Sequence, residues 1–416
     1  MELSFYIIWG AYFISLYFVV FWLLVFIENG YKDKKITKLT TFPKVSVIIP
    51  AYNEGKKVEK TIESALSLDY PKDKLEIIAV NHGSTDNILE IMNNYKDKIK
   101  IITLNRKEDE RKGAAVNAAL EIATGDFIAC LDADSSIEPL ALHKMLPYFE
   151  ENDIGAVLPR IMTEKPTTFI QKIQYCEYII VFLYKKMMSS INCLYTTPGP
   201  FSLYRKKVLD EVGKFDPSNL TEDMELALRL QKNNYRIIQT TNVEAKTFTP
   251  RTYLQYHNQR NRWYKGAILN VLKHKDLILN KKYGDFGMLQ MPFILGAAFL
   301  SVITFSIITI DKLIIPLIKK IRINYYSGFN FNLNDMIESI ENFSFLTLNY
   351  DKLFWFFLLI LIQLFLIILA YRITNRKFKE NGFYAPFLFL AIYSYTIFIA
   401  WLGVFFDLLK GKKQKW

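Results

Sequence analysis

Four long stretches that carry no charged side chain constrain the fold of this 416-residue chain most strongly. They span residues 5–27, 286–310, 353–370 and 383–406. Each is close to or above the roughly 20 apolar residues that a helix needs to cross the hydrocarbon core of a bilayer. The first is longer than the apolar part of a cleaved signal peptide, so we expect it to be retained as a helix. The sequence therefore predicts an integral membrane protein of the cell membrane with about four spans.

Basic residues set the expected orientation of these spans. Four lysines lie within residues 32–38, directly after the first stretch. Because Lys and Arg collect on the cytoplasmic side of membrane proteins, we expect the chain start outside and the segment after it in the cytoplasm. The predicted division is an N-terminal transmembrane helix at 1–30, a cytoplasmic domain at 31–285, and a C-terminal region of about three spans at 286–416.

Two segments leave the span count open by one. Four spans place the lysine-rich residues 410–416 outside, against the same rule. Residues 313–323 join an apolar half to a basic half, and they can lie flat in the interface or complete a short crossing. The glycosylation tripeptide Asn342-Phe343-Ser344 suits an external loop, although such tripeptides are common by chance.

Composition narrows the class of protein. The 51% hydrophobic residues exclude a disordered chain. The net charge of +11 comes partly from basic residues beside apolar stretches, so we interpret it as facing membrane lipids rather than nucleic acid. Three cysteines without metal-ligand spacing argue against a disulfide framework and favour a reducing compartment.

Short β-type runs alternate with amphipathic helical patterns in the first half of the domain. The runs cover residues 44–49, 75–80, 99–104 and 126–131. Continuous apolar strands joined by helices predict an α/β fold with a mostly parallel sheet covered on both faces. Ligands of such sheets bind beyond the carboxyl ends of the strands. The polar motifs PAYNE, NHGSTD, RKGAAVN and DAD follow the four runs in turn.

The second half of the domain is more helical. We expect helices over residues 166–188, 223–233 and 252–272. The segment TTPGPFSLYR, residues 196–205, is typical of a rigid turn that feeds a strand, and its prolines and glycines also allow the backbone to approach a ligand closely.

Asp132 and Asp134 flank one residue at the end of the fourth run. Both carboxylates can turn toward a common point where the backbone leaves the sheet, and hard divalent cations favour such oxygen ligands. Mg²⁺ or Mn²⁺ held there would bridge the phosphates of a nucleotide and neutralise a leaving diphosphate. The plainer interpretation is a loop with two capping aspartates, which explains most isolated matches.

Five motifs in a fixed order distinguish these interpretations. PAYNE, GSTD, TGDFIACLDAD, TED and QRNRW occur in this order between the apolar stretches. The set, over residues 44–266, resembles the family 2 glycosyltransferases, and most closely the membrane-embedded branch of hyaluronan, chitin, cellulose and poly-N-acetylglucosamine synthases. The resemblance implies a Rossmann-like GT-A fold, a nucleotide-diphosphate donor that is usually a UDP-sugar, and inversion at the anomeric carbon.

The resemblance also implies roles for the residues that match the motifs. The nucleotide is expected against Ala51, Tyr52, Glu54, His82, Lys112 and Asp132. The metal is expected on Asp132 and Asp134. The catalytic residues are expected to be Asp223, as general base, and its neighbour Glu222. The diphosphate and the acceptor are expected against Gln259, Arg262 and Trp263.

Chemistry supports these roles independently. Displacement at an anomeric carbon needs a base for the attacking hydroxyl and positive charge at the leaving group. Asp223 suits the first task, and the guanidinium of Arg262 suits the second because it binds phosphate through two parallel hydrogen bonds. Without the other motifs, Asp223 reads as an acid in the first turn of a helix, and Trp263 reads as an interfacial anchor.

One position departs from the family pattern. The family usually has an aspartate where this chain has His82, and that aspartate contacts the nucleobase. A histidine can still donate to a base carbonyl or stack on the base, so altered base preference is one alternative and an inactive member is another. His82 as an ordinary loop residue is a third.

The sequence thus predicts an inverting, metal-dependent glycosyltransferase that acts on a membrane-associated acceptor. One version is a processive polysaccharide synthase, and the other adds a single sugar to a polyprenyl-phosphate or other lipid. The rival from another class is a non-catalytic binding or assembly subunit, which the intact DAD, TED and QRNRW motifs argue against.

Overall fold

The computed structural model of the chain describes residues 2–29, 39–326, 350–382 and 385–411. The lysines of 32–38, the tripeptide at 342–344 and residues 412–416, which entered the orientation argument, lie outside the described residues. The chain divides into two compact units, Met1–Leu24 with Gly296–Leu369, and Val25–Leu295 with Ala370–Trp416.

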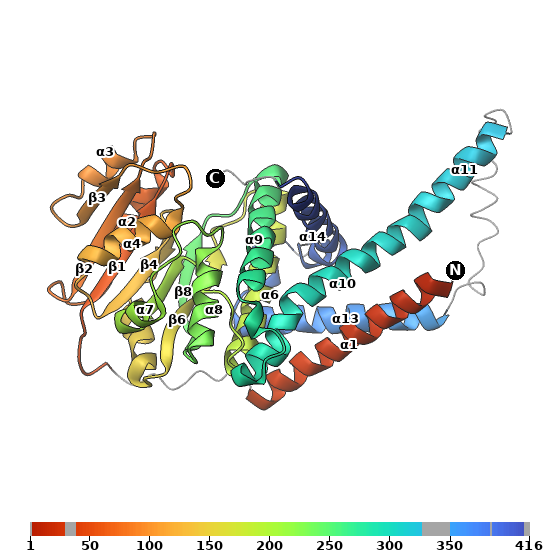
Figure 1. The fold of residues 1–416 in the computed structure, drawn as a ribbon, viewed down its shortest axis with the longest axis horizontal. Coiled ribbons are helices and arrows are strands. Elements are labelled where there is room, and N and C mark those ends of the chain that lie inside the picture. Colours follow the sequence, from red (N-terminus) through yellow and green to blue (C-terminus); the bar gives the residue numbers. More distant parts are fainter. Residues whose placement is uncertain (1, 30–38, 327–349, 383–384, 412–416) are drawn as a thin grey trace. The chain divides into compact units, whose positions relative to one another are not determined.

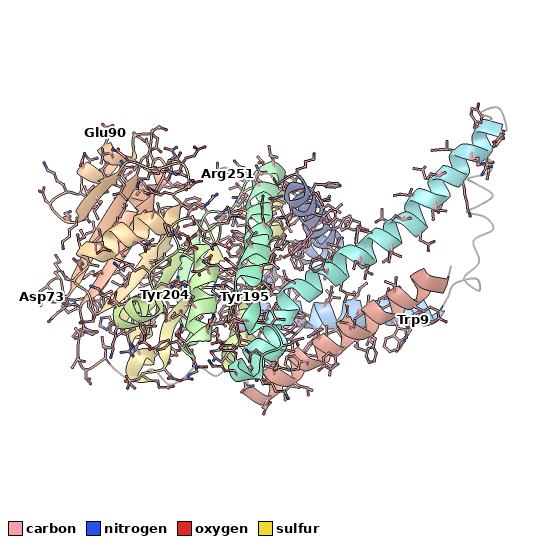
Figure 2. All side chains as sticks on the ribbon, in the orientation of Figure 1. Trp9, Asp73, Glu90, Tyr195, Tyr204 and Arg251 are labelled. Atoms are coloured by element: carbon pink, nitrogen blue, oxygen red, sulfur yellow. The ribbon has the colours of Figure 1, made fainter. Side chains whose placement is uncertain are left out.

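Apolar helices make up the first unit (Figure 1). It takes most of each of four helices, α1 (Glu2–Asn29), α10 (Met291–Thr309), α11 (Ile315–Tyr326) and α13 (Tyr350–Ile373). The rings of Trp9, labelled in Figure 2, and Trp355 meet edge to face with centroids 6.3 Å apart, so α1 packs beside α13. Such edge-to-face pairs are favoured by the charge distribution of aromatic rings.

Three helices are long and apolar enough to cross a membrane, namely Trp9–Asn29, Leu353–Ile373 and Ala385–Leu409. These confirm three of the four predicted spans as apolar helices. The fourth, residues 286–310, is helical as a π-helical turn at Phe286–Gln290 followed by α10. Its first part, Phe286–Gly296, is a shorter apolar helix. In the C-terminal region the described residues therefore form two helices of membrane-spanning length together with the apolar helix α10.

An eight-stranded sheet organises the second unit. Its strands are β1 (Val45–Ala51), β2 (Leu75–His82), β3 (Lys100–Leu104), β4 (Phe127–Leu131), β5 (Ser135–Ile137), β6 (Ile154–Thr163), β7 (Pro200–Arg205) and β8 (Arg236–Thr247). The order is β3-β2-β1-β4-β7-β6-β8-β5. The four predicted runs form β1 to β4, which are mutually parallel, and every residue of β1 and β4 is buried. That burial explains why these strands read as continuous apolar runs.

The other half of the sheet is mixed. β7 runs antiparallel to β4 and to β6, whereas β6 and β8 are parallel. β7 is the strand that the Pro/Gly segment feeds, as the rigid-turn interpretation predicts. Tyr204 of β7 is buried, and Figure 2 places it inside the domain, where its hydroxyl donates to the carbonyl oxygen of Thr197 at 3.2 Å.

The second unit also contains α-helices, most of which pack on the sheet. They are α2 (Lys57–Leu66), α3 (Ile88–Asn93), α4 (Lys112–Ile122), α5 (Ala141–Met145), α6 (Phe169–Ser190), α7 (Lys206–Val212), α8 (Glu222–Lys232), α9 (Tyr253–Lys273) and α14 (Ala385–Leu409). The three predicted helices of the second half are confirmed as α6, α8 and α9. Capping boxes start two of them, Thr168 with Gln171 on α6 and Thr252 with Gln255 on α9.

Helix α14 packs on the domain. Helix α14 lies against α6 and α9, and the ring of Trp401 stacks on Tyr264 at 4.7 Å. In the loop before α14, Arg376 forms ion pairs of 2.6 and 2.7 Å with the carboxylate of Glu244 on β8. An apolar helix of membrane-spanning length is therefore attached to the same unit as the sheet.

Candidate active site

One cavity of about 560 Å³ lies at the carboxyl ends of β1, β2 and β4 in the second unit. Parallel strands bring their carboxyl ends, and the loops that follow, to one edge of a sheet. All of the residues predicted from the motifs line this cavity, namely Ala51, Tyr52, Glu54, His82, Lys112, Asp132, Asp134, Glu222, Asp223, Gln259, Arg262 and Trp263. The fold thus brings together residues that are up to 212 positions apart in the chain, from Ala51 to Trp263.

Lys112 joins two of the motifs at the centre of the cavity. Its Nζ lies 2.5 Å from Asp132 Oδ1 and 3.4 Å from Glu222 Oε1. Burial alone would lower the pKa of Lys112, but the two carboxylates hold this pKa well above its ordinary value. Burial, with the charge of Asp223, raises the pKa of Glu222, although Lys112 opposes the shift. The sequence places Lys112 near the nucleotide but does not predict its contact with Glu222.

Gly199 makes the Lys112–Asp132 contact possible. A Cβ atom at this position would lie 2.2 Å from both carboxylate oxygens of Asp132 and 2.3 Å from Lys112 Nζ. The close backbone approach expected in this segment therefore occurs at the ion pair. The same segment holds the TED motif, because Thr197 Oγ1 donates to the carbonyl oxygen of Asp223 at 2.9 Å.

Asp134 is the second acid of the DAD motif. Burial, together with the negative charges of Asp132 and Glu54, raises its pKa to about 7. Its Oδ1 accepts hydrogen bonds from Ser135 Oγ at 3.1 Å and from Thr247 Oγ1 at 3.4 Å. A nearby cation would offset the repulsion that disfavours the ionised form.

The donor set suits a cation that is shared with a ligand. Within the described ranges, no three His, Cys, Asp or Glu side chains converge as a complete metal site. Mg²⁺ is commonly held by one or two carboxylates together with substrate phosphates and water, rather than by a cage made only of protein. Asp132 and Asp134 fit that arrangement.

The loops after β1 and β2 are tied together beside the cavity. Asn53, in a left-handed conformation with φ 52°, accepts a hydrogen bond from the backbone N–H of Thr85 at 2.8 Å. The N–H of Gly55 donates to Asp86 Oδ2 at 2.8 Å. These hydrogen bonds hold the PAYNE and GSTD motifs together as one rim beside the cavity. This contact gives a structural reason for both motifs to occur in the sequence.

His82 and Arg106 line this rim. The guanidinium of Arg106 lies over the ring of Tyr52 at 4.2 Å. His82 is buried, and its Nε2 lies 3.6 Å from Glu110 Oε2. Burial lowers the pKa of His82 despite the opposing carboxylate of Glu110. The sequence analysis did not select Arg106 or Glu110, although both follow the third β run where a ligand-binding loop is expected.

Helix α8 presents Asp223 in its first turn. Asp223 Oδ1 accepts a hydrogen bond from the N–H of Met224 at 2.8 Å. Asp223 is therefore an acid in the first turn of a helix, as the interpretation without the other motifs predicts. The carboxylate nevertheless lines the cavity. α9 fixes this turn, because Asn270 Nδ2 donates to Thr221 Oγ1 at 3.0 Å and a Cβ at Gly266 would lie 2.4 Å from the same oxygen.

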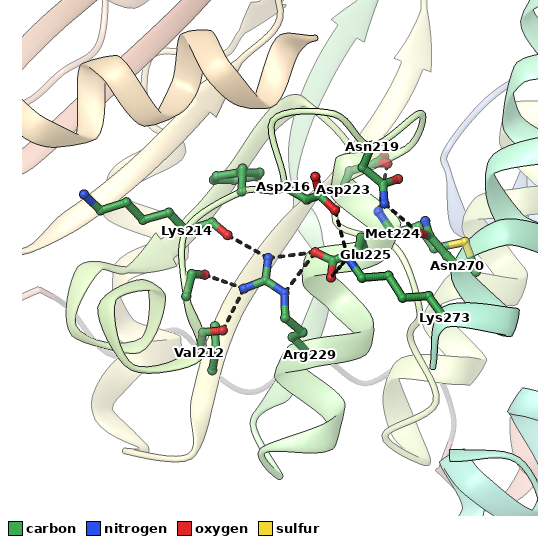
Figure 3. Close-up of polar contacts among 12 residues, drawn as sticks. Val212, Lys214, Asp216, Asn219, Asp223, Met224, Glu225, Arg229, Asn270 and Lys273 are labelled. Carbon is green, nitrogen blue, oxygen red and sulfur yellow. Dashed lines mark hydrogen bonds and ion pairs between the residues drawn. The ribbon is translucent and has the colours of Figure 1, made fainter. Parts of the chain in front are cut away.

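A network of polar contacts around Glu225 stabilises the helix that carries the TED motif (Figure 3). The carboxylate of Glu225 accepts from Arg229 Nε at 2.9 Å and from Lys273 Nζ at 3.1 Å, and it lies 3.2 Å from His274 Nε2. Burial would raise the pKa of Glu225, but hydrogen bonds from His274, Arg229 and Lys273 lower this pKa to about 2. Arg229 also donates to three carbonyl oxygens of the loop 212–214.

We expect Glu225→Gln to destabilise the domain in a pH-dependent manner. Glu225 is 2% exposed, and lowering its pKa from 4.5 to about 2 corresponds to about 3 kcal/mol of stabilisation at neutral pH. Because the pKa is depressed in the folded state, this stabilisation is present above about pH 4.5 and is lost as the pH falls toward 2. The Tm of the variant should therefore be lower than that of the wild type at pH 7, with a smaller difference at pH 3.

The matched control is Glu121→Gln, which affects an exposed carboxylate paired with Lys214. We expect it to change the free energy of unfolding by about 1 kcal/mol or less at either pH. A Tm difference for Glu225→Gln that is the same at pH 7 and pH 3 would contradict the proposed role of its charge.

Helices α6 and α9 form the opposite side of the cavity. Arg260 of α9 is 1% exposed, and its Nη2 lies 2.7 Å from Glu177 Oε2 on α6. Its guanidinium also lies over the ring of Trp263 at 4.2 Å, so this cation covers one face of the predicted acceptor residue. Gln259 Oε1 accepts from Arg260 Nη1 at 2.9 Å. The sequence analysis did not select Glu177, although it lies on a predicted helix.

The chain shows similarity to known glycosyltransferases. Residues 46–213 match the family model described as "Glycosyl transferase family 2". The chain is 31% identical over 225 residues to poly-beta-1,6-N-acetyl-D-glucosamine synthase of Staphylococcus epidermidis, and this alignment covers 54% of either chain. It is 28% identical over 261 residues to the synthase of the same name from Staphylococcus aureus strain COL, over 61% of this chain and 63% of the relative. The chain thus spans little more than half the length of these relatives.

A solved structure shares the fold. A mannosyltransferase from Pyrobaculum calidifontis, in complex with GDP-Man and Mn²⁺, superposes with a TM-score of 0.59 at 19% identity. The superposition covers 79% of this chain and 93% of that one. It confirms the predicted α/β GT-A-like domain, with its mostly parallel sheet and with apolar helices at both ends.

Proposed function

We propose that this chain, which belongs to glycosyltransferase family 2 through residues 46–213, transfers an N-acetylhexosamine from a UDP-sugar to a membrane-associated glycan. The observation that carries the proposal is the convergence of the PAYNE, DAD, TED and QRNRW motifs on one cavity, with Asp223 and the DAD acids both on its wall. The sugar and the polymeric acceptor follow the name of the relatives, poly-beta-1,6-N-acetyl-D-glucosamine synthase. The catalytic domain faces the cytoplasm, where nucleotide sugars are made.

Transfer requires a base and a stabilised leaving group. In our proposal, Asp223 accepts the proton of the attacking acceptor hydroxyl, whose oxygen forms the new bond to the anomeric carbon. The bond to the diphosphate oxygen breaks on the opposite face, so the configuration is inverted. Arg262 binds the departing diphosphate, and Lys112 holds Asp132 and Glu222 in place beside it.

Asp132 and Asp134 would hold Mg²⁺ or Mn²⁺. The cation supplies positive charge to the diphosphate as negative charge develops on it. Its charge would also favour the ionised form of Asp134, whose pKa is about 7 without it. Glu54 adds a third negative charge near this position.

We propose that the nucleobase lies at the rim formed by Tyr52 and His82. The Tyr52 ring is already covered on one side by Arg106, so it provides a rigid surface. The buried imidazole of His82, oriented by Glu110, is available to read the edge of the base.

A test of the proposal uses the purified full-length protein in detergent with UDP-N-acetylglucosamine and Mn²⁺. We expect release of UDP and a ladder of glycan lengths, and we expect chelation of the metal to stop both. Asp134→Asn should lower the transfer rate at least a hundredfold and weaken the thermal stabilisation by UDP with Mn²⁺, because a ligand that binds only the folded state raises the Tm. Asp73→Asn, at the surface of the domain in Figure 2, is the control.

The outcomes separate the alternatives. One discrete glycolipid in place of a ladder would support single addition to a polyprenyl-phosphate or another lipid. Binding of UDP without any turnover of nucleotide sugars would support a non-catalytic subunit and would contradict the proposal.

A further inference from the structure

A stripe on helix α6 lines the cavity opposite the nucleotide rim. It consists of Tyr178, Val181, Phe182 and Lys185, which are spaced three, one and three residues apart and therefore lie on one helical face. None of these residues was selected by the sequence analysis. With Trp263 of α9, the stripe gives this half of the cavity an apolar and aromatic wall that ends in a single ammonium group.

Lys185 differs from the other cations of the cavity. Across the described ranges, it has neither a hydrogen bond nor an ion pair. Lys112 is paired with Asp132, and Arg260 is paired with Glu177. Arg106 and Arg262 donate to the carbonyl oxygens of Glu110 and Leu220.

The surroundings of Lys185 make a ligand the expected partner. Burial lowers its pKa to about 8, and the negative charge of Asp223 opposes this shift. Lys185 is half-buried on the cavity wall and has no acceptor from the described residues, so a ligand oxygen would supply the hydrogen bond that the protein does not. Lys185 and Asp223 line the same cavity, so a ligand held by Lys185 would share this space with the proposed base.

The charge of the cavity favours a neutral ligand. Six carboxylates line it, on Glu54, Asp132, Asp134, Glu177, Glu222 and Asp223. Five cations line it, on Arg106, Lys112, Lys185, Arg260 and Arg262. The two negative charges of a UDP-sugar diphosphate and the two positive charges of its cation would leave this balance unchanged, so a further anionic group would enter a cavity with an excess of negative charge. Hydroxyl, ring or amide oxygens of a sugar accept from an ammonium without adding charge.

We infer that Lys185 is a positioning residue for the acceptor, which binds the oxygen atoms of a neutral terminal sugar and holds its hydroxyl toward Asp223. This inference rests on the proposed function and extends it, because it selects a neutral glycan over a lipid phosphate as the group that enters the cavity. The apolar stripe on α6 would contact the C–H face of the same sugar, while the few polar groups fix its orientation.

The test compares Lys185→Met with Lys185→Arg in the full-length protein. We expect Lys185→Met to raise the KM for a β-1,6-linked N-acetylglucosamine tetrasaccharide at least tenfold. Hydrolysis of UDP-N-acetylglucosamine by water and thermal stabilisation by UDP with Mn²⁺ should change less than twofold, since neither involves the acceptor. Lys185→Arg should recover most of the acceptor affinity because it keeps the charge and the donors. Lys172→Met, on the same helix but outside the cavity, is the control.

Other results would overturn the inference. An unchanged KM in Lys185→Met would do so, and so would a KM that rises for a polyprenyl phosphate but not for the tetrasaccharide. If the wild type shows no turnover, the proposed function fails, and the inference is then tested by binding alone. Tetrasaccharide binding that stabilises the wild type but not Lys185→Met would support it, and equal stabilisation would contradict it.

Discussion

Asp223→Asn should abolish sugar transfer while leaving nucleotide binding in place. General base catalysis contributes about 10² to 10⁴ to a rate, so we expect kcat to fall by about a thousandfold. The amide oxygen of asparagine can still accept the hydrogen bond from the N–H of Met224, so the start of α8 should be preserved. The measurement is the rate of UDP release with acceptor present, together with the Tm in the presence of UDP and Mn²⁺.

Two variants sharpen this prediction. Asp210→Asn alters an exposed aspartate on α7 and should leave the rate unchanged. Glu222→Gln should lower the rate less than Asp223→Asn does, because Glu222 contacts Lys112 and acts through that side chain. A rate for Asp223→Asn within tenfold of the wild type would rule out this residue as the base.

Glu177→Gln should produce the largest loss of stability. The variant leaves the guanidinium of Arg260, which is 1% exposed, without its counter-ion. It also weakens the hydrogen bond that the Tyr393 hydroxyl donates to Glu177 Oε1 at 3.0 Å, so α6, α9 and α14 lose a common contact. Removing one partner of a buried ion pair costs about 3–5 kcal/mol. At about 2–4 °C per kcal/mol, we expect the Tm in detergent to fall by roughly 10 °C.

A double replacement tests whether the lost charge is the cause. Glu177→Leu combined with Arg260→Met removes both charges, and apolar pairs of similar volume often recover the stability that a single replacement loses. Asp276→Asn breaks the exposed pair with Lys232 and should cost about 1 kcal/mol or less. A Tm of Glu177→Gln equal to that of the wild type would show that the pair does not hold these helices together.

Much of the fold could be predicted from local patterns. The runs that became β1, β2 and β4 are apolar because these strands are buried over all or most of their length, and this property belongs to consecutive residues. The helices α6 and α9 begin at threonine capping boxes, which are also local. The antiparallel strand β7 and the attachment of α14 to the domain depend on contacts between distant segments, and no periodicity encodes them.

In the candidate site, too, local patterns predicted some features and others depend on contacts between distant segments. The motifs identified the residues on the cavity wall because each occupies a few adjacent positions after a strand or at a helix start. The contacts of Lys112 with Glu222 and of Arg260 with Glu177 join residues 110 and 83 positions apart, and the sequence did not predict them. The same holds for Lys185, which looks like any lysine of an amphipathic helix.

By itself, then, the sequence determined the apolar helices, the α/β domain and the order of the motifs, because all three depend on patterns of residues that are close together in the sequence. Only the tertiary structure decided which charges of the cavity pair, and which of them has no partner among the described residues. The physical reason is that a buried charge is stabilised or destabilised by whatever the fold places within a few ångströms, and that depends on residues far away along the chain.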